Sequence, residues 1–504
     1  MIKFLSQRFR KIIAYLENPE IPFGYFILSL LFWITLRNFL EIFSDRAVVS
    51  FKLFAPLHPL YYVAYKGLVI SYLHYYLSWI SVILGIGLLA FLFTKESLGK
   101  IFRVAFSLSF ILNITPLVDL IVTKGAGANI AYIYPSALSQ FFPLPANMTA
   151  GMSVTFATTL ILFFTYCFFK TNRIRMSLLA TLIVHIVLSL FGAMALFLKA
   201  VTPLPLIRIF TLIIFAEILI IFFIQNRVFF KTLLKDIRPF RILHSELMFV
   251  LGIFLAGPGL YALLQKEFLS FLLIIVGIFL AGLSAIIINN LSDCDIDKIN
   301  SPQRPLPAQA IPRESYKRAA VYAFSLAMLC AAAVNFTTLF FILLAIGNYF
   351  IYSTFPFRLK RVPLFSKLFV SFTSLLLVML GYVFAGQELL TFPSIIAWYF
   401  LTLITLCTNF IDLKDYEGDK QAGILTLPVI FGPKIAKIVI GIFFLIAYSA
   451  LSFVFLDLRL LLPGLVVGGI QFVLINKKRY QEKWVFSLHL AAVIALLFYL
   501  YQIY

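Results

Sequence analysis

Charged residues are scarce in this chain of 504 residues. Asp, Glu, Lys and Arg together make up 12% of it, about half of the roughly 25% that is usual in soluble domains. Only 21 residues are acidic, and long polar stretches are missing, which excludes a large water-soluble domain. The four cysteines form no C-x-x-C pair and show no metal-ligand spacing, which argues against a disulfide framework or a zinc site.

Apolar and aromatic residues take the place of the missing charge. Hydrophobic residues make up 62% of the chain, which includes 57 Phe and 24 Tyr, and the mean hydropathy is +1.01. This composition is typical of a membrane protein with many spans. We therefore attribute the net charge of +20 to loops that orient the protein and contact anionic lipid headgroups, rather than to nucleic-acid binding.

Apolar runs of about 20 residues, the length of a membrane-spanning helix, follow one another along almost the whole chain. Polar, Gly or Pro breaks separate fifteen of them and predict an all-α membrane protein. Six spans are expected in the first part, at 23–44, 69–93, 101–122, 153–170, 176–198 and 205–226. Nine are expected after it, at 243–264, 268–290, 315–333, 337–355, 365–386, 392–411, 434–454, 458–475 and 485–503.

The distribution of Lys and Arg predicts which side of the membrane each loop faces. Alternate loops of this topology, together with the N-terminal segment, hold 32 of the 41 basic residues. By the positive-inside rule these loops and the N-terminus are cytoplasmic, and with fifteen spans Tyr504 lies on the other side. The most charged connector, residues 226–246, marks a domain boundary, so we expect a six-span domain at 1–235 and a nine-span domain at 236–504.

Two acidic motifs follow apolar helices on the predicted cytoplasmic side. The first lies in the segment 289–307, where Asn289, Asp293 and Asp297 are spaced i, i+4 and i+8. If the helix continues into this segment, these three side chains share one face. The second lies at 412–428, where three more carboxylates are spaced i, i+3 and i+7 and again share a face; they are Asp412, Asp415 and Asp419.

Two facing rows of oxygen ligands suit Mg²⁺, which binds through one or two carboxylates plus substrate phosphate oxygens. Two such ions would hold a diphosphate between the rows and neutralise charge on it as it leaves, and Arg304 would complete the clamp. The competing interpretation is that these are solvated loop carboxylates that balance nearby Lys and Arg. Against it, these two short stretches hold seven of the 21 acidic residues.

The motifs resemble those of the UbiA-type intramembrane prenyltransferases. The first is similar to that family's NDxxDxxxD signature and the Pro-x-Arg-Pro-x-Pro run after it, and the second to its DxxxD signature with a following Gly and Thr-Leu-Pro. Between them, Tyr352-Ser353 followed by Leu359-Lys360-Arg361 is similar to the basic loop after the family's fourth helix. The resemblance covers about residues 240–504 and implies a nine-helix prenyltransferase bundle.

The resemblance implies roles for individual residues. Asn289, Asp293 and Asp297 would serve one Mg²⁺, and Asp415 and Asp419 the other, with Asp412 added to the second set by its spacing. The catalytic carboxylates would be Asp293, Asp297, Asp415 and Asp419. The basic residues expected to bind the diphosphate are Arg304, Lys360, Arg361 and Lys420.

The implied reaction is transfer of a polyprenyl group from an isoprenoid diphosphate to a membrane-associated acceptor. An aromatic precursor of a quinone or pigment is the first expectation for the acceptor, and a geranylgeranylglyceryl phosphate-type lipid is the second. The alternative from another class is a non-catalytic transporter or scaffold that keeps a degenerate prenyltransferase fold. The six-span N-terminal domain resembles no family, and its role stays open among acceptor binding, partner recruitment and separate work in the same pathway.

Some residues depart from the pattern or stand outside it. Asn290 occupies the position of the first Asp in the most familiar signature, which argues against a role for it in metal binding. Asp295 is expected to face away from the first acidic row. Asp119 and Glu217 are ionisable residues within predicted spans, for which function competes with helix–helix hydrogen bonding. The five histidines show no metal-ligand spacing, and we assign them scattered interfacial or packing roles.

Overall fold

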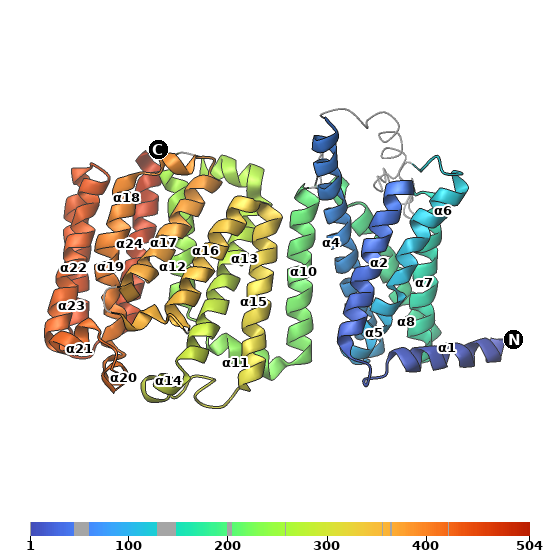
Figure 1. Ribbon diagram of the computed structural model, residues 1–504, viewed down its shortest axis with the longest axis horizontal. Helices are drawn as coiled ribbons and strands as arrows, with labels where there is room; N and C mark the ends of the chain where they lie inside the picture. The colour runs from blue at the N-terminus through green and yellow to red at the C-terminus, as the bar shows by residue number, and fades with distance from the viewer. Residues whose placement is uncertain are drawn as a thin grey trace. The chain divides into compact units, whose positions relative to one another are not determined.

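A computed structural model describes residues 2–44, 60–128, 148–198, 204–257, 259–354, 356–362, 365–421 and 423–503 of the chain. These residues form helices and connecting turns, with no β-strand in the parts described (Figure 1). The chain divides into two compact units, Met1–Arg227 and Val228–Tyr504. Their junction lies in the charged connector 226–246. The division into domains at 1–235 and 236–504 stays a prediction.

Fourteen stretches of the described residues are helical, long enough and apolar enough to cross a membrane, so the protein is an integral, multi-pass membrane protein. Six of them lie in the first unit, as the sequence predicts. These spans are formed by α2 (Phe23–Ser44), α4 (Leu60–Thr94), α5 (Leu98–Leu108) with α6 (Ile114–Val122), α7 (Ala150–Thr171), α8 (Ile174–Gly192) and α10 (Leu204–Gln225).

Asp119 of the first unit has a structural explanation. Its two carboxylate oxygens accept hydrogen bonds from the Gly151 backbone N–H, at 2.8 Å, and from the Thr149 hydroxyl, at 2.6 Å. These donors stand at the start of α7, where backbone N–H groups lack partners within the helix and a negative charge is favoured. Asp119 therefore fixes the start of α7 against α6. Glu217, the other ionisable residue singled out in this unit, is buried in α10 opposite Gly85 of α4.

The second unit holds eight stretches of spanning length and a shorter helix before them, so the predicted nine spans are not confirmed. The shorter helix, α12, has 17 residues, at the lower end of what a span requires. The prediction of one span over 243–264 is wrong, because Gly257 and Gly259 have positive φ angles of 114° and 142° and separate α12 from α13. The long helices are α12 (Pro239–Leu255), α13 (Leu260–Ser292), α15 (Arg313–Val334), α16 (Phe336–Ser353), α17 (Phe365–Phe384), α22 (Pro433–Val454), α23 (Leu461–Asn476) and α24 (Glu482–Ile503), and a further span, Ser394–Leu413, is built from short helical segments.

Short helices carry the acidic motifs at one end of the second unit. Figure 1 shows α14 (Cys294–Asn300) and α20 (Tyr416–Gln421) at the same end of its long helices, and these two short helices contact each other. The basic loop helix η3 (Leu359–Arg361) contacts α16 and α17. The fold therefore brings together three motifs that are far apart in the sequence.

Two glycines allow α12 and α17 to cross at backbone contact. A Cβ atom added to Gly252 would lie 1.9 Å from the Val378 carbonyl oxygen, and one added to Gly381 would lie 1.9 Å from the Phe249 carbonyl oxygen. Small residues at such crossings are typical of membrane helix pairs, which associate by close packing. This crossing fixes two helices whose other ends enter the site described next.

The crossing predicts a strong effect of a single methyl group. Gly252→Ala and Gly381→Ala should each lower the stability of the purified protein by about 1–3 kcal/mol, because the backbones must separate to admit a Cβ. Gly347→Ala is the matched control, since nothing lies within 4 Å of its added Cβ. Thermal unfolding in detergent measures the effect, and equal melting temperatures for all three variants would show that the backbones are not in contact.

Candidate active site

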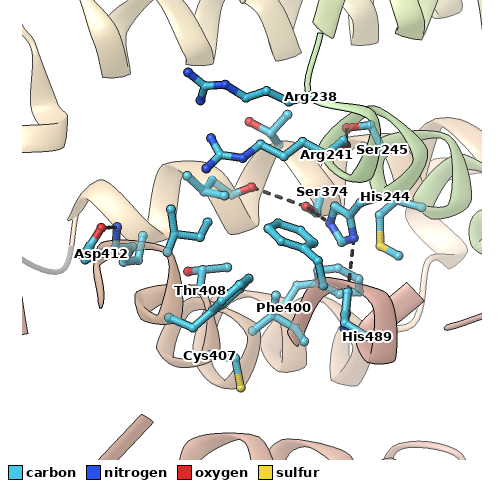
Figure 2. A pocket seen from close by; sticks show the side chains of 18 of the residues that line it. Arg238, Arg241, His244, Ser245, Ser374, Phe400, Cys407, Thr408, Asp412 and His489 are labelled. Carbon is cyan, nitrogen blue, oxygen red and sulfur yellow. Dashed lines mark hydrogen bonds and ion pairs between the residues drawn. The ribbon is translucent and has the colours of Figure 1, made fainter. Parts of the chain in front are cut away.

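A cavity of about 270 Å³ opens among the helices of the second unit. One end is lined by carboxylates and basic side chains, and the other by aliphatic side chains that include Leu251, Leu255 and Val454. Figure 2 shows Arg238, Arg241 and Asp412 in the wall of this cavity, together with His244 and His489. Such a cavity suits a ligand with a charged head and an apolar tail.

Most of the residues predicted as a site line the charged end. These are Asn289, Asp293, Asp297, Arg304, Lys360, Asp412, Asp415 and Asp419. Arg361 and Lys420 do not line the cavity and are exposed, so their binding to a diphosphate stays a prediction without support from the geometry.

The first acidic row, formed by Asn289, Asp293 and Asp297, stays on one face although the helix is broken within it. α13 ends at Ser292 and α14 begins at Cys294, yet the backbone N–H of Asp293 donates to the Asn289 carbonyl, and that of Asp297 to the Asp293 carbonyl, at 2.9 and 2.8 Å. These i→i−4 bonds keep the three side chains on one face. Asp295 points away as expected, because its side chain is 93% exposed and pairs with Lys298.

Each carboxylate of the first row is held by a cation. Asp293 pairs with Lys360 and, at 3.0 Å, with Arg358. Asp297 pairs with Arg304 at 2.6 Å. Burial raises the pKa of Asp297, and the Arg304 charge opposes this rise. At least one cation therefore faces each carboxylate of the first row, as partly buried ions require.

The second row has a carboxylate oxygen without a partner. Asp412 is 7% exposed and pairs through one oxygen with Lys367 of α17, while its other oxygen, Oδ2, is buried and accepts no hydrogen bond. Burial raises the pKa of Asp419 to about 7, and the carboxylates of Asp412 and Asp415 add to the rise. Negative charge is thus concentrated and incompletely compensated at this point of the cavity, which fits a cation ligand.

The described residues contain no group of three or more His, Cys, Asp or Glu side chains close enough to hold a metal ion by themselves. This finding excludes a closed protein cage in the described part of the chain. It agrees with an ion such as Mg²⁺, which takes one or two carboxylates and completes its shell with water and phosphate oxygens.

Asn290 belongs to a buried network behind the cavity wall. Its Oδ1 accepts a hydrogen bond from Arg238 at 2.6 Å, and its Nδ2 donates to Asp236 at 2.8 Å and to the Tyr316 hydroxyl at 3.0 Å. Tyr316 also donates to Asp236. Arg238 lines the cavity and Asn290 does not, so Asn290 positions an arginine instead of facing the site itself.

Sequence reasoning missed several residues of the cavity. Arg241 and Lys414 line its charged end and share one carboxylate, that of Glu482. The two histidines His244 and His489 also line it, although the sequence interpretation treated them as scattered. These residues lie on α12, α24 and the segment before α20. Their spacing along the sequence does not indicate that they lie close together.

Comparisons with known proteins agree on the second unit. The sequence profile of the UbiA prenyltransferase family matches residues 247–493. Proteins named digeranylgeranylglyceryl phosphate synthase are similar in sequence: that of Pyrococcus abyssi is 30% identical over 215 residues, or 42% of this chain and 73% of the relative. That of Thermococcus sibiricus is 31% identical over 225 residues, or 43% of this chain and 74% of the relative.

Among solved structures, a UbiA homologue from Archaeoglobus fulgidus bound to DMAPP and Mg²⁺ has a TM-score of 0.43 and 21% identity. It covers 54% of this chain and 100% of its own. The apo structure of a UbiA homologue from Aeropyrum pernix has a TM-score of 0.42 and 18% identity, with 52% of this chain and 98% of its own covered.

The network around Asn290 predicts a reciprocal rescue. Asn290→Asp should destabilise the protein by about 2 kcal/mol, because it sets a second buried carboxylate against Asp236 and removes a donor. The double variant Asn290→Asp/Asp236→Asn exchanges the two groups, retains one negative charge beside Arg238, and should recover most of the loss. Melting temperatures in detergent measure both, and a double variant no more stable than the single one would contradict the network.

Proposed function

The chain belongs to the UbiA prenyltransferase family and is a prenyltransferase, and from this premise we propose that the cavity of the second unit is its active site. The proposed reaction is transfer of a polyprenyl group from an isoprenoid diphosphate to a hydroxyl of a membrane lipid. The observation that carries the proposal is the cavity itself, in which two acidic motifs and their cations line one end and aliphatic side chains line the other.

Mg²⁺ is the proposed cofactor. Asn289, Asp293 and Asp297 would hold one ion, and one or two of the carboxylates of Asp412, Asp415 and Asp419 would hold the other, with phosphate oxygens and water completing its shell. The buried, unpartnered oxygen of Asp412 supports the second site, since a cation would supply the contact that it lacks. When bound, such ions would neutralise the charge that develops on the leaving diphosphate.

The cations of the first row then take a second role. Lys360 pairs with Asp293, and Arg304 pairs with Asp297. With a metal ion on those carboxylates, Lys360 and Arg304 would be available to bind the diphosphate. Arg304 suits this role because its planar guanidinium matches two phosphate oxygens at once.

The apolar part of the cavity suits the prenyl chain. Leu251 and Leu255 of α12 line it together with Leu451 and Val454 of α22. A diphosphate at the charged end would place the first carbons of the chain beside the polar side chains between the two ends. The remaining isoprene units would extend among aliphatic side chains, where their burial is favourable.

A glycerophosphate-type lipid is the acceptor that we favour. The relatives reported above are named for the synthesis of digeranylgeranylglyceryl phosphate. Arg241 and Lys414 line the charged end of the cavity and would bind the anionic headgroup of such a lipid. The aromatic quinone precursor expected from the sequence remains the alternative acceptor.

We also propose that the charged end of the unit faces the cytoplasm. The loops at this end include the basic segments 291–318, 356–367 and 412–437, and the positive-inside rule assigns such loops to the cytoplasmic side. Labelling of whole cells that carry the Ala308→Cys variant would test this assignment. Reaction of that cysteine with an impermeant maleimide would show that the charged end faces the outside of the cell instead.

The first functional prediction concerns metal dependence. Purified protein incubated with geranylgeranyl diphosphate, a geranylgeranylglyceryl phosphate acceptor and Mg²⁺ should form the prenylated lipid, and EDTA should abolish the reaction. Asp293→Asn should lower kcat/KM at least 100-fold, because it removes charge from the proposed metal site. Asp295→Asn is the matched control on α14, and a similar loss in that exposed variant would contradict the assignment.

The second functional prediction concerns the acceptor. With a panel that contains the glycerophosphate lipid, hydroxybenzoate, homogentisate and dihydroxynaphthoate, product should form with the lipid. Lys414→Gln should raise KM for that lipid about tenfold, the equivalent of roughly 1.4 kcal/mol, and leave KM for the prenyl diphosphate within twofold. Prenylation of an aromatic acceptor alone would establish the alternative.

A further inference from the structure

Four uncharged polar side chains form a continuous hydrogen-bonded chain in the cavity. His244 Nε2 lies 3.0 Å from Ser374 Oγ, and His244 Nδ1 lies 3.2 Å from His489 Nε2. His489 Nδ1 lies 3.0 Å from the Tyr448 hydroxyl. All four residues line the cavity, and they come from α17, α12, α24 and α22. Figure 2 shows His244 joined by dashed lines to Ser374 and His489.

The hydrogen bonds among these four side chains can be arranged in two ways that leave both imidazoles neutral. In one, Tyr448 donates to His489, His489 to His244, and His244 to Ser374, whose hydroxyl reaches the Val370 carbonyl at 3.5 Å. In the other, every bond is reversed and Ser374 donates to His244. A neutral imidazole carries one donor and one acceptor nitrogen, so both arrangements satisfy all four ring nitrogens.

The four hydrogen-bonded residues lie just inside the charged end of the cavity. Ser374 follows Lys367 by seven residues in α17, and His489 follows Glu482 by seven in α24, which places each about 10 Å deeper along its helix. Lys367 and Glu482 take part in the ion pairs of the charged end. A diphosphate bound among those charges would hold its first prenyl carbon between the two layers, next to Ser374.

We infer that these four residues, named here the histidine relay, accept the proton that the lipid hydroxyl loses during transfer. This inference rests on the proposed function. As the hydroxyl oxygen bonds to the first prenyl carbon, the bond from that carbon to the diphosphate breaks and its electron pair leaves with the diphosphate. The hydroxyl proton passes to Ser374 Oγ while the Ser374 proton passes to His244 Nε2, and the charge is shared between His244 and His489.

The relay separates the base from the metal site. Asp293 pairs with Lys360 and Asp412 with Lys367, and the proposed metal ions would engage the carboxylates of both acidic motifs. A proton acceptor of two neutral imidazoles adds no negative charge beside the diphosphate. Ser374 is then the group that contacts the acceptor, and His244, His489 and Tyr448 act through it.

The test compares two acceptors that differ in their need for a base. The first is the geranylgeranylglyceryl phosphate lipid, and the second is its analogue with a thiol in place of the free hydroxyl. At about pH 9.5 most of the thiol is ionised, given a pKa of about 8.5 for cysteine, so its transfer requires no proton acceptor. Ser374→Ala and His244→Gln are assayed with both acceptors at that pH.

With the hydroxyl acceptor, both variants should lose about 100-fold in kcat, the scale of general-base catalysis, and KM for the prenyl diphosphate should stay within twofold. With the thiol acceptor, their kcat should lie within about threefold of the unmodified protein. Two controls should keep their activity with both acceptors: Ser371→Ala and Tyr382→Phe. Ser371 and Tyr382 lie in α17 outside the cavity lining, and their hydroxyls bond to the backbone carbonyls of Phe400 and Thr391.

Three results would overturn the relay. These are full activity of Ser374→Ala and His244→Gln with the hydroxyl acceptor, equal losses of these variants with both acceptors, and losses of the same size in the two controls. Absence of product from the unmodified protein with either acceptor would instead remove the proposed function, and the relay with it. Normal transfer by the unmodified protein and by both relay variants would leave the proposed function standing and reject the relay alone.

Discussion

Charge compensation within an apolar protein is the constraint on which the rest of the second unit depends. A carboxylate removed from water is costly unless a cation or a set of donors faces it. Asp293 and Asp297 meet this requirement through Lys360 and Arg304. Asp412 meets it through one of its two oxygens, which pairs with Lys367. Each of these pairs either joins different helices or closes a loop against one, so the ion pairs also hold the helix ends around the cavity. The charges that suit a diphosphate and its metal ions are thus the charges that hold the helix ends together.

The cavity is layered along the helices. Ion pairs occupy one end, the histidine relay follows about two helical turns deeper, and aliphatic side chains from α12 and α22 line the rest. The close crossing of α12 and α17 at Gly252 and Gly381 supports this order, since α12 carries His244 and α17 carries both Lys367 and Ser374. A prenyl diphosphate has the same sequence of parts: an anionic head, a reactive carbon and an apolar tail.

Asn290 illustrates how a departure from a motif is compensated elsewhere. The sequence indicates that an amide replaces the usual carboxylate at this position. In the folded chain the negative charge stands on Asp236, which Asn290 contacts at 2.8 Å, and Arg238 is bonded to Asn290 at 2.6 Å. The local charge beside the arginine is therefore retained, although it comes from a residue 54 positions earlier in the chain.

The sequence by itself determined the class of protein, most of its spans and both acidic rows, because these depend on local composition and helical spacing. Apolar runs of about 20 residues specify spans wherever they occur, and i, i+4 spacing places Asn289, Asp293 and Asp297 on one face. The tertiary structure alone decided which cations meet which carboxylates, that Arg361 and Lys420 lie outside the cavity lining, and that His244 and His489 adjoin. These two histidines stand 245 residues apart, and contacts between helices so distant in the chain follow from packing, for which local spacing carries no signal.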